Sequence, residues 1–164
     1  MRKLKPGIIL FIILFVLWII LAGTDRDELI IAGVSSLVIS LLFASKAKAL
    51  GNIHLSPKAI CCAFMYLFVF LRELVKSTID VAGRVLSPRL PINPGIVKVH
   101  TRLKSPLGRL ILANSITLTP GTMTVETQGE YFYIHWIDIQ TDDIETTTKA
   151  IVSIFEEYLE VIFG

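Results

Sequence analysis

Two long apolar runs near the N-terminus constrain this chain more than any other feature. The first, from Gly7 to Gly23, contains no charged residue, and the second, from Leu29 to Ala44, is interrupted only by three serines. As a helix, each run would extend roughly 25 Å, slightly less than the ~30 Å hydrocarbon thickness of a bilayer. Only five residues join the runs, so we predict an antiparallel hairpin of two transmembrane helices within residues 1–45.

Composition supports a membrane protein. Of the 164 residues, 53% are hydrophobic and 18% are charged, which excludes a disordered chain and is too apolar for an ordinary soluble domain. A cleaved signal peptide is the alternative for the first run, because basic residues precede it. However, the run is longer than a typical signal-peptide core, and the following TDRDE is a poor cleavage site. We therefore favour a retained anchor.

The basic residues around the hairpin predict its orientation. Positive side chains lie before the first run and after the second: Arg2, Lys3, Lys5, Lys46, Lys48 and Lys58. The connecting loop is mostly acidic, with Asp25, Asp27 and Glu28 beside Arg26. By the positive-inside rule, both ends of the hairpin lie in the cytoplasm. The expected location is the bacterial cell membrane, multi-pass, with the N-terminus and the C-terminal domain cytoplasmic.

The third hydrophobic region is amphipathic. Residues 59–71 are apolar all round, but as a helix they would reach only ~20 Å. From there on, polar side chains share one arc of a helix: Arg72, Glu73, Lys76, Asp80 and Arg84. We predict a membrane-associated amphipathic helix within 46–86, with this arc as a solvated or headgroup-facing polar face. A third spanning helix over about 60–81 is the alternative, but it would carry many basic residues outward.

The C-terminal part predicts a small α+β cytoplasmic domain over residues 96–164, after a proline-rich linker at 87–95. Alternation predicts a strand at 96–103, and Ser105-Pro106 predicts a helix start. Thr119-Pro120-Gly121-Thr122 fits a type II turn. Strands at 123–127 and 131–138 form a hairpin, and Asp142 or Asp143 caps one final helix. The predicted order is β-α-β-β-α.

Chemical motifs are absent from the sequence. It has no glycine-rich phosphate loop, HExxH or CxxC, and its three histidines are scattered. Neither apolar run contains an ionisable residue, which argues against an ion pathway in this chain alone. We expect no catalytic, cofactor or metal site, and no enzymatic activity. Nucleic-acid binding is disfavoured because the basic residues adjoin membrane segments.

Charge is unevenly distributed along the chain. Residues 46–109 hold eleven of the sixteen Lys and Arg residues, whereas residues 110–164 hold nine of the fourteen Asp and Glu residues. The near-neutral total therefore combines a basic segment beside the membrane with an acidic distal segment. The acidic segment would suit basic cytoplasmic loops of neighbouring subunits.

Four stretches resemble one family: LANSITLTPGTMT (112–124), YIHWIDI (133–139), RELVKSTIDVAGRVL (72–86) and NPGIVKV (93–99). They are similar to the E subunit of the multisubunit Na+/H+ antiporters of bacteria, the Mrp or Mnh complexes. Met123 departs from the aliphatic residue expected there. The resemblance implies an accessory or structural subunit of a monovalent cation (Na+)/proton antiporter. Its implied partners are other polytopic subunits, which carry the ions, and the lipid bilayer.

The family-like motif also supplies candidate residues. The candidate subunit-interaction or structural motif comprises Asn114, Thr117, Thr119, Pro120, Gly121, Thr122, His135 and Trp136. A tight turn alone would also explain the Thr-Pro-Gly sequence. The alternative function is a membrane-anchored cytoplasmic binding module unrelated to ion transport.

Overall fold

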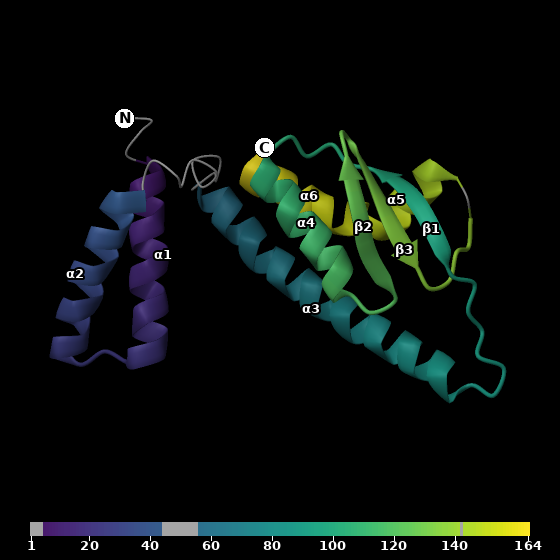
Figure 1. Cartoon of the computed structure of the whole chain (residues 1–164), viewed down its shortest axis with the longest axis horizontal. Helices are drawn as coiled ribbons and strands as arrows, with labels where there is room; N and C mark the ends of the chain where they lie inside the picture. The colour runs from purple at the N-terminus through teal and green to yellow at the C-terminus, as the bar shows by residue number, and fades with distance from the viewer. Residues whose placement is uncertain (1–4, 44–55, 142) are drawn as a thin grey trace. The chain divides into compact units, whose positions relative to one another are not determined.

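The computed structural model describes residues 5–43, 56–141 and 143–164. Asp142 and the basic segment 46–55 lie outside the described residues. The chain divides into two compact units, residues 1–53 and 54–164, which are considered separately (Figure 1).

The first unit is a helical hairpin. Helix α1 (Lys5–Ala22) ends at Gly23, whose φ of 101° suits glycine, and α2 (Arg26–Phe43) follows directly. Small residues four apart on α2, Ala32, Ser36 and Ser40, are buried. At the loop end, the indole nitrogen of Trp18 donates a hydrogen bond of 3.1 Å to Glu28. Helices α1 and α2 pack against each other.

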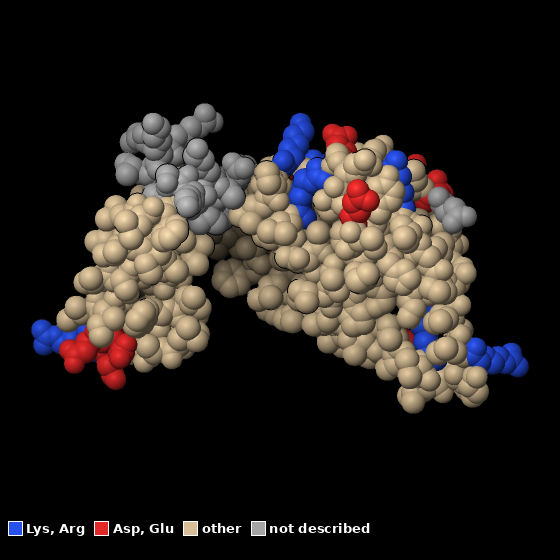
Figure 2. Space-filling view, in the orientation of Figure 1, with Lys and Arg blue, Asp and Glu red and all other residues tan. Residues whose placement is uncertain are grey.

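The outer surface of this hairpin is apolar. On the face that Figure 2 shows, the charged side chains of the described part of the hairpin lie at its loop end. Large apolar side chains are exposed along both helices, among them Ile12, Val16, Ile20, Val34, Leu37 and Leu41. Within the described residues, no helix combines enough length and apolarity to cross a membrane. The two membrane crossings therefore stay a prediction.

The second unit begins with a single long helix, α3 (Pro57–Leu86). The Ser56 side chain caps it by accepting a hydrogen bond from the Ala59 amide at 3.1 Å, and Pro57 occupies the first turn. The predicted apolar stem and amphipathic segment are thus one uninterrupted helix. Its outer surface carries exposed apolar residues at helical spacing: Ile60, Phe64, Phe68, Leu71, Val75 and Ile79.

A three-stranded antiparallel sheet forms the rest of the second unit with three helices. The strands are β1 (Gly95–His100), β2 (Thr122–Gln128) and β3 (Tyr131–Trp136), in the spatial order β1-β3-β2. Helix α4 (Pro106–Leu118) connects β1 to β2, and α5 (Ile144–Ile151) and α6 (Ser153–Phe163) follow β3. This arrangement confirms the predicted α+β character.

The core lies between one face of the sheet and the helices. The sheet contributes Val99 of β1 and Phe132 and Ile134 of β3, which are fully buried. The helices contribute Leu112 of α4 and Leu159 of α6, which are at most 1% exposed. The Ser105 side chain caps α4 through the Gly108 amide, as predicted. Helix α3 packs against α6, and the Tyr66 and Ser115 hydroxyls join α3 to α4 by a hydrogen bond.

We predicted one final helix, and this prediction is wrong in one respect: the helix is divided at Val152 into α5 and α6. The Val152 carbonyl accepts hydrogen bonds from the amides of both Phe155 and Glu156, each at 3.0 Å, which tightens the turn locally. Three consecutive threonines, 146–148, precede the division, and β-branched residues weaken helices. Asp143 is the capping residue of α5, accepting from the Thr146 amide at 2.8 Å.

Candidate functional site

Two of the five residues of the polar arc of α3 point toward the α+β part of their own unit. Glu73 and Arg84 have side chains that are only 12% and 18% exposed. The predicted solvated face therefore holds for Arg72, Lys76 and Asp80, whose side chains are 73%, 69% and 56% exposed, but not for these two residues. The reason is that the apolar side of α3 faces outward, so the opposite side meets the turn after α4 and the end of β3.

Glu73 lies in an incompletely satisfied environment. Its Oε2 atom is 3.6 Å from Lys76 Nζ, and its Oε1 atom is 3.8 Å from a guanidinium nitrogen of Arg72. The Oε1 atom is hidden from solvent and has no hydrogen-bond partner. Such a carboxylate oxygen is costly to bury, which makes this part of α3 a candidate for a functional role.

Arg84 is the centre of a second charged group. Its Nε atom lies 2.7 Å from Asp80, one turn earlier, and its Nη1 atom lies 2.9 Å from Asp138. Nη1 also donates to the carbonyl of Pro91 at 2.7 Å. Hydrogen bonds with Asp80 and Asp138 hold the pKa of Arg84 above its ordinary value. The cation is thus fixed between α3 and the segment after β3.

The Thr-Pro-Gly turn lies directly against α3. Gly121 has a φ of 91°, and the Thr122 amide donates to the Thr119 carbonyl at 3.2 Å, as a type II turn requires. The Ile137 amide donates to the Gly121 carbonyl at 2.9 Å. A Cβ at Gly121 would lie 3.0 Å from Ile137 Cγ2 and 3.4 Å from Val81 Cγ2. A side chain at this position would press against Ile137, just after β3, and against Val81 of α3.

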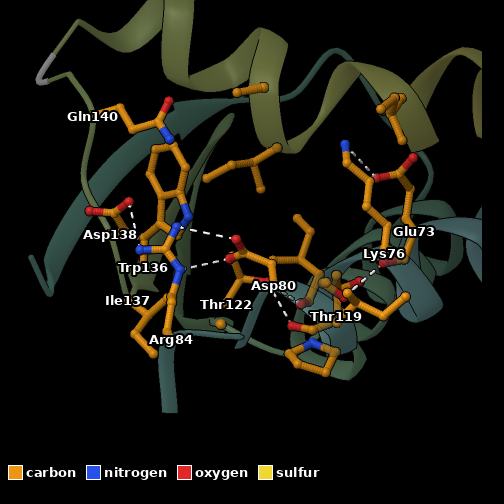
Figure 3. Close-up of a pocket in the computed structure, with 18 of the residues that line it drawn as sticks. Glu73, Lys76, Asp80, Arg84, Thr119, Thr122, Trp136, Ile137, Asp138 and Gln140 are labelled. Atoms are coloured by element: carbon orange, nitrogen blue, oxygen red, sulfur yellow. Dashed lines mark hydrogen bonds and ion pairs between the residues drawn. The ribbon is translucent and has the colours of Figure 1, made fainter. Parts of the chain in front are cut away.

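Helix α3, the Thr-Pro-Gly turn, the end of β3 and the C-terminal helices line a cavity of about 500 Å³ (Figure 3). It brings together nine of the residues that the sequence singled out: Glu73, Lys76, Asp80, Arg84, Thr119, Pro120, Gly121, Thr122 and Trp136. The Trp136 indole forms one wall and the Glu73–Lys76 pair lies opposite. Ile151 and Phe155 add apolar surface from the C-terminal helices. The volume falls in the range of small-molecule sites.

Four predicted residues lie outside this cavity. Arg72 lines a neighbouring groove instead, and Asn114 is exposed on α4. Thr117 accepts a hydrogen bond from the Thr124 amide at 3.1 Å, which joins α4 to β2. His135 is half-buried on β3, where side chains alternate, so it faces away from Trp136.

The sequence did not single out Asp138 or Gln140, which also line the cavity. Both follow β3, and no local pattern indicates that this segment returns to α3. A charge next to the family-like HWI sequence is the one signal that could have identified Asp138.

The arrangement is suited to binding. Its charged side chains face side chains of opposite charge. The Thr119 hydroxyl donates a hydrogen bond of 2.7 Å to the Ser115 carbonyl, and the Thr122 hydroxyl donates one of 2.6 Å to the Ile116 carbonyl. Over residues 5–43, 56–141 and 143–164, no group of three or more His, Cys, Asp and Glu side chains is placed to hold a metal ion.

The family model and the relatives of known name agree on one family. A model of the family described as "Na+/H+ ion antiporter subunit" matches residues 11–162. The Na+/H+ antiporter E1 subunit of Staphylococcus haemolyticus is 33% identical over 149 residues, which cover 84% of this chain and 86% of the relative. The Na+/H+ antiporter E subunit of Alkalihalophilus pseudofirmus is 45% identical over 73 residues, 43% of this chain but only 46% of that protein.

One solved structure is similar over almost the whole chain. It belongs to the membrane-bound sulfane sulfur reductase, an archaeal respiratory membrane complex. The matching chain is 40% identical with a TM-score of 0.85, and the match covers 97% of this chain and 99% of that one.

Proposed function

Because the chain belongs to the family of Na+/H+ ion antiporter subunits, we propose that it is an accessory, non-catalytic subunit of a multisubunit Na+/H+ antiporter. The observation that carries this proposal is an exposed apolar hairpin whose residues 7–22 and 29–43 include no charged side chain. Moving ions through a bilayer normally requires buried ionisable groups. Partner subunits therefore carry the ions, and this chain supports their assembly and activity.

The hairpin is the membrane anchor in this proposal. Each helix has 18 residues and extends about 27 Å, so snorkelling ends and slight bilayer thinning accommodate two crossings. Exposed apolar surface of this extent needs lipid or apolar protein to cover it. The charged loop lies outside the cell, and the basic residues on both sides of the hairpin keep its ends in the cytoplasm.

The remaining segments follow from this placement. Residues 1–45 form the anchor, 46–86 a basic segment and membrane-associated helix, 87–95 a linker and 96–164 a cytoplasmic domain. The exposed apolar stripe of α3 supports contact with the membrane surface, since its opposite side already packs on the α+β part. The acidic C-terminal segment suits basic cytoplasmic loops of polytopic partners.

Sodium-dependent exchange in everted membrane vesicles tests the accessory role. Deleting this chain from the complex should abolish or strongly weaken Na+/H+ exchange, while the purified chain alone in liposomes should exchange nothing. Exchange by the lone chain would overturn the accessory role.

Capture from native membranes separates this proposal from the alternative binding module. Several polytopic proteins recovered in fixed ratio support the antiporter complex. A single soluble protein recovered in their place would support a membrane-anchored binding module, for which the cavity beside Trp136 would be the natural site.

Cysteine labelling tests the orientation. Cys61 and Cys62 are first replaced by serine, and Asp27→Cys and Gly129→Cys are made separately. An impermeant maleimide should label the first variant on intact cells and the second only after permeabilisation. Labelling of both from outside would instead support a third crossing through α3.

A further inference from the structure

Two hollows adjoin each other on α3. The first is the cavity beside Trp136, and the second is a groove of about 600 Å³ lined by Leu71, Arg72, Val75, Lys76 and Ile79. Lys76 and Ile79 line both. A cavity of mixed charged and apolar lining therefore continues into an apolar groove on the outer side of the helix.

The cavity and the groove differ in the sign of their net charge. Around Trp136, the single cation Arg84 faces two carboxylates, Asp80 and Asp138, so this end has an excess negative charge. Toward the groove, Arg72 and Lys76 face the single carboxylate of Glu73, so this end has an excess positive charge. Lys76 and Asp80 are one helical turn apart, about 6 Å. The site thus presents opposite charges a short distance apart, next to apolar surface.

We propose that the cavity and the groove together bind one phospholipid whose zwitterionic headgroup carries a phosphate and a primary ammonium. The phosphate contacts Arg72 and Lys76, both of which are largely exposed. The ammonium lies in the cavity, where Asp80 and Asp138 accept its hydrogen bonds and the face of Trp136 attracts the cation.

The groove holds the beginning of an acyl chain. Leu71, Val75 and Ile79 are exposed apolar residues on one stripe of α3, and the stripe leads away from Lys76. Charge complementarity selects this occupant over an anionic lipid, which has no group for Asp80 and Asp138. The inference rests on the proposed function, because α3 must lie at the membrane surface for a lipid to enter.

Fluorescence quenching of Trp136 tests the inference on the full chain. The chain has two tryptophans, so Trp18→Phe makes Trp136 the only reporter. This variant is reconstituted into vesicles containing acyl-brominated phosphatidylethanolamine, phosphatidylglycerol or phosphatidylcholine. We expect the strongest quenching with the ethanolamine lipid. Equal quenching by all three lipids, or none by any, would overturn the proposal.

Single substitutions test the phosphate contact and the apolar groove separately. Lys76→Gln should reduce the quenching of Trp136 by the ethanolamine lipid roughly two- to fivefold, as expected for one exposed ion pair. Val75→Asp in the groove should also weaken it, whereas Val125→Asp, at a similarly exposed position on β2, should not. An identical loss in both aspartate variants would contradict a specific groove.

Soluble phosphorylethanolamine distinguishes a lipid from a free phosphate. It should not reverse the quenching at concentrations comparable with the lipid, because it lacks the acyl chain, and full reversal would assign the site to a soluble ligand. Na+/H+ exchange and capture of polytopic partners are measured separately, in membranes whose antiporter complex contains the same variants. Loss of lipid selectivity with intact exchange then refutes this inference without refuting the proposed function.

Discussion

Arg84 on α3 and Asp138, two residues beyond β3, form an ion pair whose nitrogen–oxygen distance is 2.9 Å. The same guanidinium contacts Asp80 on α3 and the carbonyl of Pro91 in the linker. Three separate parts of the sequence are thereby joined at one end of α3. This relationship fixes the helix against the end of the sheet and closes one side of the cavity.

Replacing Arg84 by alanine should therefore lower the melting temperature of the full chain in detergent. The substitution leaves Asp80 and Asp138 without their shared cation and removes a donor to Pro91. Arg84→Lys should restore only part of the loss, because an ammonium cannot reproduce the planar fork of donors. Arg89→Ala, at an exposed position just beyond the helix, is the matched control and should leave the melting temperature unchanged. Equal melting of both alanine variants would show that the ion pair contributes nothing.

The predictable parts of this fold are those with a local cause. Ser105 caps α4 and Gly121 has the positive φ of a type II turn, as the sequence predicted, and Asp143, one of the two predicted caps, caps α5. Each depends on the backbone of its next few residues. Such signals can be recognised without knowing what lies elsewhere in the fold.

The site could not be predicted in the same way. The periodicity of α3 divides it into a polar and an apolar side, but it does not say which side faces protein. Glu73 and Arg84 face inward because the apolar stripe faces outward, and that depends on what surrounds the helix. The strand order β1-β3-β2, which brings Asp138 to α3, is equally a property of the assembled sheet.

Glu156 gives a sharper prediction of stability. Its side chain is 3% exposed and accepts hydrogen bonds from the Thr101 hydroxyl at 2.6 Å and from the Arg102 amide at 2.8 Å. Glu156→Ala removes the acceptor of the buried Thr101 hydroxyl and of the partly buried Arg102 amide, so the free energy of unfolding should fall by about 2–3 kcal/mol. Glu156→Gln should lose less, since it keeps one acceptor oxygen. Urea titration of the full chain in detergent measures both.

The neighbouring Glu157 is exposed and serves as the control for this measurement. Glu157→Ala should change the free energy of unfolding by no more than about 0.5 kcal/mol. A similar loss at both positions would mean that the Glu156 hydrogen bonds do not cause the effect.

Asp143 should make stability depend on pH in the acid range. Hydrogen bonds from Thr146 hold the pKa of Asp143 below its ordinary value in the folded chain. A carboxyl group with a lowered folded pKa stabilises the fold fully above its unfolded pKa of about 3.9. That stabilisation is lost as the pH falls through the lowered folded value. The advantage of the natural chain over Asp143→Ala should therefore be constant near neutral pH and shrink below about pH 4.

Asp143→Asn separates titration from capping in this experiment. Asparagine also caps helices well but does not titrate, so its advantage over alanine should stay constant across the same pH range. Urea titrations of the three chains at a series of pH values provide the comparison. An Asp143 advantage that persists unchanged into strong acid would exclude the carboxylate as its source.

Gly121 provides a test of how closely the Thr-Pro-Gly turn approaches α3. Alanine there must adopt a φ of 91°, and its Cβ would lie 3.0 Å from Ile137 and 3.4 Å from Val81. Gly129 also has a positive φ, of 55°, but nothing lies within 4 Å of a Cβ at that position. Both alanine variants therefore carry a backbone cost of about 1–2 kcal/mol, while only Gly121→Ala adds about 1–3 kcal/mol from overpacking.

Shortening the residue on α3 completes this test. Val81→Ala removes the methyl group that faces Gly121, so it should cost less in a Gly121→Ala background than in the natural chain. The rescue should be partial, because Ile137 is the closer neighbour and stays in place. Additive losses in the double variant, measured by urea unfolding, would show that α3 moves away freely from the turn. Coupled losses would instead mean that the turn holds α3 in position and thereby sets the width of the cavity beside Trp136.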